Sequence, residues 1–448
     1  MKSKRFYLET YGCQMNQADS ELISSILLDA GYQPSQIEEA DIILLNTCAV
    51  REHAEQRVLG RIGQLHSLKL KKPGLILAVV GCMAQRLGRG LVEKIPYVNL
   101  VAGPDSYRQL PQMIEASGNG HPFVKTELAS QETYSNITPC RQSRITAWVP
   151  IMRGCNNFCS YCVVPYVRGR ERSIPHPFIL KQVSQLAEQG YKEVTLLGQN
   201  VNSYWDGQVD FAQLLKLIDQ NTKIPRLRFL SPHPKDMSER VLGAMAEGKS
   251  ICEHLHLPLQ SGSTRILQRM KRGYSAEQFL DLVDRARKAI KGLTISTDII
   301  VGFPGEKEED FQETLSLVKE IRFDSAFTYR YSPRQGTEAF YLPDDVSPEE
   351  KRERLDRLIS LQRQIMAEKQ VKLVGSHLEV LIEKRNRRGA LLGRTRTDRP
   401  VVLEDGQALA LGDIVEVEIV GATSATLVGQ ILSKDSLCIR QNSSATMI

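Results

Sequence analysis

Hydrophobic residues in the first 110 positions alternate between continuous apolar runs and helical repeats. The runs predict strands buried on both faces, and the repeats between them have the spacing of amphipathic helices. The strands are expected at 5–11, 41–47 and 75–81, and the helices at 17–30 and 51–65. Because strands that alternate with helices form parallel sheets, we expect an N-terminal parallel α/β domain over residues 1–120.

A polar stretch over residues 117–143 shows little periodicity and is typical of a linker or of a surface excursion. From about residue 144 the alternation resumes and continues for six βα units. The strands are expected at 146–152, 193–197, 226–230, 254–257, 293–301 and 324–331, and the helices at 177–189, 210–219, 237–247, 263–270, 275–290 and 307–321. Six units predict a partial (β/α)6 barrel rather than the full eight-unit barrel.

The pattern changes after residue 346. Ser347-Pro-Glu-Glu350 has the spacing of a capping box with proline at the first helical position, so a long charged helix should run to about residue 372. Short strands separated by Gly and Asp turns then predict a small all-β barrel. These strands are expected at 378–382, 400–403, 414–420 and 425–432. The chain is therefore predicted to be α/β, with a central domain over 140–372 and a C-terminal barrel over 373–440.

The composition adds that the chain is globular, since 42% of its 448 residues are hydrophobic and 25% are charged. The longest apolar runs, such as residues 75–80, are far too short to cross a membrane. The first residues contain no apolar signal region, so we expect a cytoplasmic protein without membrane contacts. Nine cysteines are too sparse for a secreted disulfide scaffold, and their positions are more informative than their number.

Three cysteines lie within eight residues, directly after the first strand of the predicted central barrel. Cys155, Cys159 and Cys162, here called the barrel triad, place three soft thiolates on one loop, where they can bind one iron–sulfur cluster. Zinc or an ordinary ferredoxin cluster would use four ligands, so three leave one iron open to a substrate. The alternatives are a zinc site completed by a distant ligand and a chance grouping of core cysteines.

Three further cysteines follow the three N-terminal strands, one after each. Cys13, Cys48 and Cys82, the sheet triad, should converge because the carboxyl ends of parallel strands meet at one edge of the sheet. They would form a second three-ligand site, and the alternative is a set of inert, half-buried thiols. The remaining cysteines have no partner at ligand spacing; they are Cys140, Cys252 and Cys438.

The net charge of +6 is concentrated in two windows. Residues 141–172 contain six arginines and one acid, and residues 384–399 contain seven basic residues and one acid. A basic face on a small β-barrel suits the phosphate backbone of a nucleic acid, whereas the alternative is a solvated run of charge. The residues of the second window that are expected to contact RNA are Lys384, Arg385, Arg387, Arg388, Arg394, Arg396 and Arg399.

The CxxxCxxC spacing at the end of the first barrel strand resembles the radical S-adenosylmethionine (SAM) superfamily. Nearly the whole chain resembles the methylthiotransferases, which combine a three-cysteine domain, a radical-SAM partial barrel and a C-terminal TRAM domain of RNA-binding type. Three motifs are similar to those of the tRNA branch: Tyr11-Gly-Cys-Gln-Met-Asn16, Asn46-Thr-Cys-Ala-Val-Arg51 and Cys82-Met-Ala-Gln-Arg86. Ile174, Lys307 and Gln335 depart from the expected pattern.

This resemblance implies SAM and two [4Fe–4S] clusters as cofactors. The barrel triad would hold the cluster that binds and cleaves SAM, and the sheet triad would hold an auxiliary cluster that delivers sulfur. The implied product is tRNA that carries a sulfur and a methyl group at C2 of N6-isopentenyladenosine 37, the methyl group coming from a second SAM. The SAM contacts that the resemblance implies are Tyr161, Gly198, Gln199, Asn200, Gly302 and Glu306.

The implied partners are tRNA and a reductant protein such as flavodoxin or ferredoxin, and we expect a monomer. The sequence does not indicate the sulfur donor. The same chemistry could act instead on threonylcarbamoyladenosine in tRNA or on an aspartate side chain of a ribosomal protein. A rival of another class is a non-catalytic iron–sulfur protein that binds RNA and senses the redox state.

Overall fold

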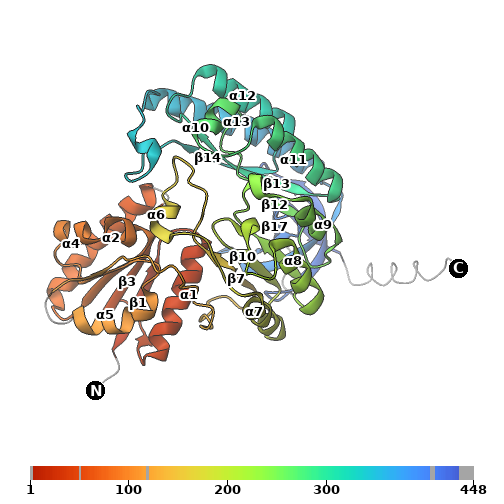
Figure 1. Cartoon of the computed structure of the whole chain (residues 1–448). Helices are drawn as coiled ribbons and strands as arrows, with labels where there is room; N and C mark the ends of the chain where they lie inside the picture. The colour runs from red at the N-terminus through yellow and green to blue at the C-terminus, as the bar shows by residue number, and fades with distance from the viewer. Residues whose placement is uncertain (1–3, 50–51, 118–120, 404–408, 433–448) are drawn as a thin grey trace.

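The computed structural model describes residues 4–49, 52–117, 121–403 and 409–432 (Figure 1). Three units follow one another along the chain: a parallel sheet with helices, a second set of parallel strands with helices, and a small closed barrel. The predicted domain end at 440 and Cys438 lie outside the described residues. No helix in the described part of the chain combines the length and the apolar character that a membrane span requires.

The N-terminal unit is built on a six-stranded, entirely parallel sheet with the order β2-β1-β3-β4-β5-β6. Its strands are β1 (Arg5–Thr10), β2 (Gln33–Pro34), β3 (Ile42–Thr47), β4 (Ile76–Gly81), β5 (Leu100–Ala102) and β6 (Phe123–Lys125). Its helices are α1 (Gln14–Asp29), α2 (Glu52–Lys71), α3 (Cys82–Leu87), α4 (Arg89–Lys94) and α5 (Leu110–Ser117). The three predicted strands are present as β1, β3 and β4. The other three contain only two or three residues, too few to show a period.

The described part of the predicted linker, residues 121–143, packs against this unit. Its residues 123–125 form the edge strand β6, which pairs with β5. Further along, the Tyr134 hydroxyl donates to the Pro104 carbonyl at 3.0 Å, and Ser25 on α1 donates to the Thr138 carbonyl at 2.7 Å. Polar groups of this segment form hydrogen bonds with the N-terminal unit. Polarity alone does not distinguish such a packed segment from an extended connection between domains.

The central unit contains the six predicted strands, all parallel to their neighbours. They are β7 (Thr146–Pro150), β10 (Glu193–Leu197), β11 (Arg226–Phe229), β12 (His254–His256), β13 (Thr294–Val301) and β14 (Ser325–Arg330). A parallel bridge between Leu227 and Ile251 joins the sheet β11-β10-β7 to the sheet β12-β13-β14. The helices between the strands are α7 (His176–Glu188), α8 (Phe211–Asn221), α9 (Glu239–Glu247), α10 (Thr264–Arg269), α11 (Ala276–Ala289) and α12 (Glu308–Ile321). The partial (β/α)6 barrel is confirmed.

The long helix α13 (Pro348–Val371) begins with the predicted capping box, in which the Ser347 hydroxyl accepts from the Glu350 N–H at 3.2 Å. Its 24 residues span about 36 Å at about 1.5 Å per residue. Near its start Arg354 donates to Glu306, which follows β13, and near its end Lys369 pairs with Asp324, which precedes β14. The helix therefore runs along the strands from their carboxyl ends to their amino ends.

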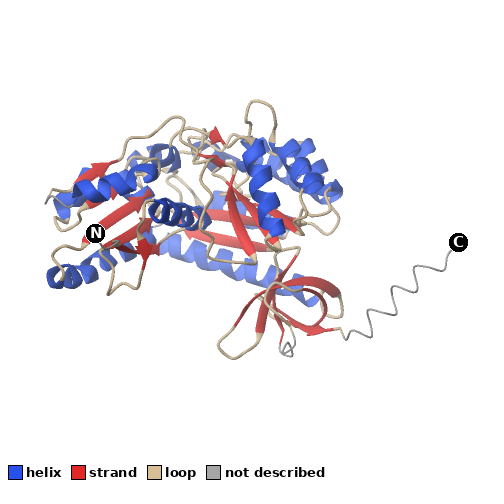
Figure 2. Cartoon of the chain, turned by 90° about the horizontal axis from the view of Figure 1, so that it is seen from below, coloured by secondary structure: helices blue, strands red, loops and turns tan. Residues whose placement is uncertain are grey.

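The C-terminal unit is a closed five-stranded barrel with the order β15-β16-β17-β19-β18. Its strands are β15 (His377–Arg385), β16 (Leu391–Thr395), β17 (Pro400–Leu403), β18 (Ile414–Ala422) and β19 (Leu427–Ile431). The barrel stands at the lower right of Figure 2. The sequence analysis missed β16, which lies inside the second basic window. Its inward residues, Leu391, Gly393 and Thr395, include a single large apolar side chain, so the alternation is hidden by charge.

The barrel packs against the amino ends of the central strands through residues 394–399, here called the docking turn. Arg226 and Arg228 on β11 donate to the carbonyls of Arg394 and Thr395, each at 2.8 Å. Thr294, at the start of β13, donates to the Thr397 carbonyl at 2.8 Å. The barrel therefore lies at the opposite end of the strands from the cysteine loop.

Candidate active site

The sheet triad lies after three neighbouring strands, β1, β3 and β4, at their carboxyl ends. The register pairs Thr10 with Asn46 and Thr47 with Gly81, so the three strands end at nearly the same level. Cys48 and Cys82 are buried, and Cys13 is exposed. The structure thus brings these three cysteines to one edge of the sheet.

The loops that carry the sheet triad approach one another closely. Gly12 has a φ of +144°, and a Cβ at this position would lie 2.7 Å from the Cβ of Cys48. The Asn16 amide donates to the Thr47 carbonyl at 3.1 Å and to the Asn46 side chain at 3.2 Å, which joins α1 to the end of β3. Only glycine allows this contact between the first two cysteine loops.

The thiol of Cys82 is buried and accepts a hydrogen bond from an arginine. Burial raises the pKa of Cys82 to about 12, the charge of Arg168 lowers it, and the charges of Cys48 and Cys13 raise it. The Arg168 Nε donates to its sulfur at 3.2 Å. A thiol with this pKa stays protonated at neutral pH unless a cation stabilises the thiolate, as metal binding does.

The barrel triad lies on the loop between two short elements, β8 (Met152–Arg153) and α6 (Val164–Arg168). Gly154, with a φ of +81°, directly precedes Cys155, and a Cβ there would lie 2.0 Å from the Arg170 carbonyl oxygen. The Gly154 N–H donates to the Gln199 side chain at 2.6 Å. These contacts hold the loop against the end of β10.

The three thiols of the barrel triad share a buried environment. Burial raises the pKa of Cys155 to about 11 and that of Cys162 to about 12, and the charge of Cys159 raises both. The Arg272 Nη1 donates to the Cys159 sulfur at 3.3 Å. Each triad therefore has an arginine on one of its sulfurs, although the two arginines come from different elements.

Neither triad is gathered tightly around one point in the described structure. Among the described residues, no three His, Cys, Asp or Glu side chains lie close enough together to hold one metal ion. Ligands of a single zinc must converge to about 2.3 Å from one atom, whereas the thiolates of a [4Fe–4S] cluster bind different irons and stay farther apart. Three thiolates in each triad match the ligand type of an iron–sulfur cluster.

Three of the expected SAM contacts lie beside the barrel triad, after β10. A Cβ at Gly198 would lie 2.5 Å from the Met152 side chain, so this position has no room for a larger residue. Gln199 accepts from the Gly154 N–H, as described above. Asn200 is buried, and its amide donates to Asp236 at 2.8 Å.

The other expected SAM contacts are placed differently. The Glu306 carboxylate is buried and accepts from the Gly302 N–H at 2.9 Å and from Arg354 at 3.1 Å. It therefore fixes the loop after β13 to α13, and its contacts are with the protein. Tyr161 packs against the apolar cluster that contains Phe303, which places this loop near the barrel triad.

Buried polar atoms at the carboxyl ends of the strands mark a site that the sequence analysis missed in part. Four such atoms have no hydrogen-bond partner among the described residues: Asn157 Nδ2, Asn200 Oδ1, His233 Nε2 and Gln260 Oε1. Each would cost about 1–3 kcal/mol unless a ligand bonded to it. Gln260 and Ser231 also have φ values of 71° and 61°, a strained backbone that is common at ligand sites. These four atoms fit a ligand that, like SAM, carries several polar groups.

The first basic window joins the N-terminal and central units. Arg153 and Arg168 both pair with Asp19, at 2.6 and 2.7 Å, and the Asp19 side chain is fully buried. Arg141 pairs with Glu21 at 2.7 Å, and Arg172 pairs with Asp105 at 2.9 Å. Four of the six arginines are thus used inside the molecule, and among the described residues only Arg144 and Arg170 of this window lack an ion pair.

Helix α6 and the residue before it connect the surroundings of the two triads. Val163 and Val167 share one buried apolar cluster with Ala49 and Cys82. Because Val163 directly follows Cys162, the last ligand of the barrel triad is one residue away from the cluster that contains the last ligand of the sheet triad.

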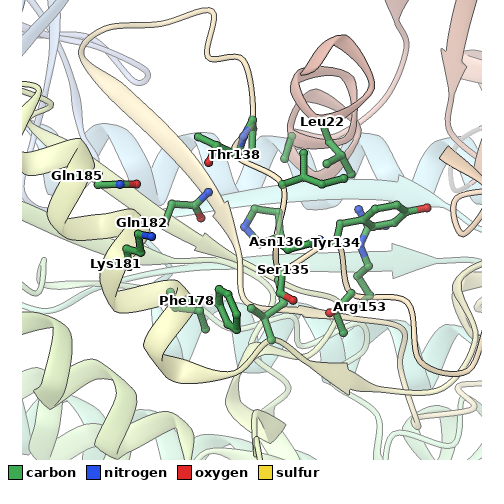
Figure 3. A pocket seen from close by; sticks show the side chains of 17 residues that line it. Leu22, Tyr134, Ser135, Asn136, Thr138, Arg153, Phe178, Lys181, Gln182 and Gln185 are labelled. Atoms are coloured by element: carbon green, nitrogen blue, oxygen red, sulfur yellow. The ribbon is translucent and has the colours of Figure 1, made fainter. Parts of the chain in front are cut away.

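A pocket of about 230 Å³ lies where residues 133–139 of the predicted linker pass between α1 and α7 (Figure 3), and neither triad lines it. Leu22 on α1, residues 133–139 and Phe178 on α7 line it, and Arg153 contributes to its wall. It contains no cysteine, and we assign it no role.

The seven residues expected to bind RNA fall into two groups. Arg394 pairs with Glu193, Glu383 and Asp398, Arg396 pairs with Glu253, and Arg399 pairs with Asp324. These three belong to the docking turn and are occupied by carboxylates, which leaves little of their charge for RNA. The four exposed residues lie at the end of β15 and in the turn after it, and are here called the basic tip: Lys384, Arg385, Arg387 and Arg388.

Comparison with known proteins agrees with this architecture. Residues 5–103 match the Uncharacterized protein family UPF0004, residues 149–318 match the Radical SAM superfamily, and residues 371–432 match the TRAM domain. Among solved structures, the cobalamin-dependent SAM radical enzyme OxsB has a TM-score of 0.54 at 15% identity, covering 81% of this chain and 56% of that chain. The radical SAM methyltransferase TsrM from Kitasatospora setae has a TM-score of 0.55 at 14% identity, covering 75% and 77%. At such identities the likeness shows the fold alone, and the match over residues 149–318 defines the central unit as a radical SAM domain.

Curated relatives define the family more narrowly. Proteins called tRNA-2-methylthio-N(6)-dimethylallyladenosine synthase from Chlorobium phaeobacteroides (strain BS1) and Clostridium novyi (strain NT) are each 46% identical to this chain. The alignments cover 95% and 96% of this chain and 97% of each relative. The chain belongs to the family of tRNA-2-methylthio-N(6)-dimethylallyladenosine synthases.

Proposed function

We propose that this protein inserts a sulfur and a methyl group at C2 of N6-isopentenyladenosine 37 in tRNA, with SAM and two [4Fe–4S] clusters as cofactors. The observation that carries the proposal is the pair of cysteine triads, which α6 and the residue before it connect and which each have an arginine on one sulfur. The relatives' names state the product, 2-methylthio-N(6)-dimethylallyladenosine in tRNA, in which dimethylallyl is another name for the isopentenyl group.

Each triad has a distinct role in this proposal. When bound to three thiolates, a [4Fe–4S] cluster retains one open iron, at which SAM can be reduced and cleaved. Cys155, Cys159 and Cys162 hold this cluster, and Gln199 orients their loop through the Gly154 N–H. Cys13, Cys48 and Cys82 hold the second cluster, which serves sulfur delivery.

SAM would lie at the carboxyl ends of the central strands. Asn200, His233 and Gln260 each offer a buried polar atom without a protein partner there. Burial, together with the charges of Arg272 and Lys235, lowers the pKa of His233 to about 2, so its imidazole is neutral at physiological pH. Because its Nδ1 accepts from the Lys235 N–H at 3.2 Å, the neutral ring carries its hydrogen on Nε2, which can donate to the ligand.

The remaining partners are also proposals. The exposed basic tip supplies cations for the tRNA backbone, and a reductant protein such as flavodoxin or ferredoxin supplies the electrons. We propose that the enzyme acts as a monomer, and the sulfur donor is left open.

Separate removal of one ligand from each triad tests the proposal. Protein reconstituted anaerobically should contain about eight irons and, when reduced with SAM, should release 5′-deoxyadenosine. Cys155→Ala should abolish that release. Cys13→Ala should retain it but form no methylthio nucleoside on an anticodon stem-loop RNA that carries isopentenyladenosine. Equal loss of 5′-deoxyadenosine in both variants would contradict the separate roles.

The substrate is tested with matched RNAs. The same stem-loop with threonylcarbamoyladenosine in place of isopentenyladenosine should remain unmodified by the wild-type protein. Methylthiolation of that RNA alone would assign the other tRNA substrate, and absence of 5′-deoxyadenosine under every reducing condition would favour the non-catalytic sensor.

A further inference from the structure

Exposed aromatic side chains gather around the cysteine loop of the central unit. Seven aromatic side chains are exposed among the described residues: Phe158, Tyr166, Phe178, Trp205, Phe327, Phe340 and Tyr341. Phe158 and Tyr166 lie on or beside the loop of the barrel triad, and Phe340 and Tyr341 lie on a segment in contact with it. We call these four residues the aromatic rim. Single exposed aromatics are ordinary, whereas four around one loop suggest a binding surface.

One side of the rim consists of two aromatic rings and a guanidinium group in contact. Phe158 and Tyr166 pack edge to face with ring centroids 5.7 Å apart, and the Arg170 guanidinium lies 4.5 Å from the centroid of Phe158. Phe158 is 37% exposed and Tyr166 is 48% exposed. Arg170 is exposed and has no carboxylate within ion-pair distance among the described residues, unlike Arg153, Arg168 and Arg172.

The other side of the rim comes from the turn η4 (Glu338–Tyr341). The Ala339 N–H donates to the Ser160 carbonyl at 2.7 Å, which attaches η4 to the middle of the cysteine loop. Phe340 and Tyr341 pack edge to face with ring centroids 5.3 Å apart, and Tyr341 is 77% exposed. In Figure 1 the segment that contains η4, in blue-green, lies beside α6.

The C-terminal barrel lies too far from the triads to hold the target base beside them. The docking turn places that barrel at the amino ends of the central strands, and the triads lie at the carboxyl ends. Helix α13, about 36 Å long, runs between the two ends. The basic tip belongs to the barrel, so it can bind the RNA but cannot hold the target base near the barrel triad.

We infer that the aromatic rim, together with Arg170, binds the unstacked bases of a single-stranded RNA loop. Proteins recognise such bases by stacking them on aromatic rings and arginine planes, and a neighbouring cation pairs with the backbone phosphates. The inference rests on the proposed function and extends it by naming the surface that holds the anticodon loop. An electron-donor protein is the other partner that could cover this surface.

The test measures equilibrium binding of an anticodon stem-loop RNA to the reconstituted protein without SAM, so that turnover does not enter. Tyr166→Ala and Tyr341→Ala should each weaken binding about fivefold or more, since stacking on one aromatic ring contributes substantially per base. Tyr166→Phe keeps the ring and should stay within about twofold of wild type. Phe178→Ala is the matched control, because Phe178 is 45% exposed but lies on the outer helix α7.

Two further measurements separate stacking from charge and from folding. Arg170→Ala should reduce the slope of log affinity against log salt by about one, whereas the tyrosine variants should leave that slope unchanged. Binding of a duplex RNA without the loop should be the same in the tyrosine variants and in wild type. Equal loss of loop and duplex binding would overturn the inference.

The outcomes also distinguish this inference from the proposed function. If wild-type protein does not bind the stem-loop, the proposed function fails together with the rim. If wild type binds it and the tyrosine variants bind equally well, only the rim inference fails. Slower reduction by flavodoxin in the tyrosine variants, with unchanged RNA affinity, would assign the surface to the electron donor.

Discussion

At the scale of single residues, buried arginines of the central unit form ion pairs with a carboxylate of the N-terminal unit. Burial raises the pKa of Asp19, but the charges and hydrogen bonds of Arg153 and Arg168 outweigh it, so the pKa is lowered. One carboxylate thus pairs with two buried guanidinium groups from the central unit. Since Arg168 also donates to Cys82, the same network borders the sheet triad.

Asp19→Asn should destabilise the reconstituted protein by about 3–5 kcal/mol, because it leaves two buried guanidinium groups without a counter-charge. Urea unfolding at neutral pH measures this difference. A carboxylate with a lowered pKa contributes stability above its ordinary pKa, and this contribution is lost as the pH falls. The difference between wild type and variant should therefore shrink below pH about 4.

Glu39→Gln is the matched control for Asp19→Asn. The ion pair of Glu39 with Arg5 is exposed, and its loss should cost less than about 1 kcal/mol. Equal costs for the two variants would contradict the importance of the Asp19 network.

At the scale of elements, the second basic window divides into two parts with different roles. The arginines of the docking turn form ion pairs with Glu193, Glu253 and Asp324, which lie close to the amino ends of the central strands. The basic tip, by contrast, is exposed. Residues only a few positions apart in the sequence thus serve domain packing and, in our proposal, RNA binding.

Arg396→Ala should lower the midpoint of thermal unfolding and leave the salt dependence of RNA binding unchanged. The reason is that Arg396 pairs with Glu253 and also donates to the Ile251 carbonyl at 2.7 Å. The double variant Arg387→Ala/Arg388→Ala should do the reverse, with a salt slope reduced by about two and an unchanged midpoint. A midpoint lowered equally by both sets would show that the tip is structural as well.

The sequence predicted most elements because their periods are local. The six strands of the central barrel and α13 are present within a few residues of their expected positions, and both cysteine triads lie at the ends of strands. The missed strands β2, β5, β6 and β16 are short or carry charge in place of apolar alternation. His233 and Gln260 were missed because an unpartnered buried atom leaves no signal in a sequence.

At the scale of the whole molecule, the central unit is held at both ends. The N-terminal unit contacts it through the Asp19 network, and the C-terminal barrel covers the amino ends of its strands. Arg226 is fully buried, and it donates both to the Arg394 carbonyl and to Glu379 on β15. The barrel is therefore a structural part of the central unit in addition to any role in RNA binding.

A chain that ends at residue 372 should be less stable than the full chain, since Arg226 and Glu193 would lose partners supplied by the barrel. We expect a lower midpoint in urea and a smaller soluble yield. A chain that ends at residue 432 keeps these contacts and is the control. Identical midpoints for the two shortened chains would show that the barrel is an independent appendage.

The sequence by itself determined the class of fold and the position of both cysteine triads, since hydrophobic periods and ligand spacings act over a few residues. Only the tertiary structure decided which arginines are available to RNA. Arg153 and Asp19 are separated by 134 positions, and Arg226 is 168 positions from the carbonyl to which it donates. A charged side chain looks the same in a sequence whether it faces solvent or a buried carboxylate. Its role depends on the partner that folding places beside it, and that partner comes from another domain.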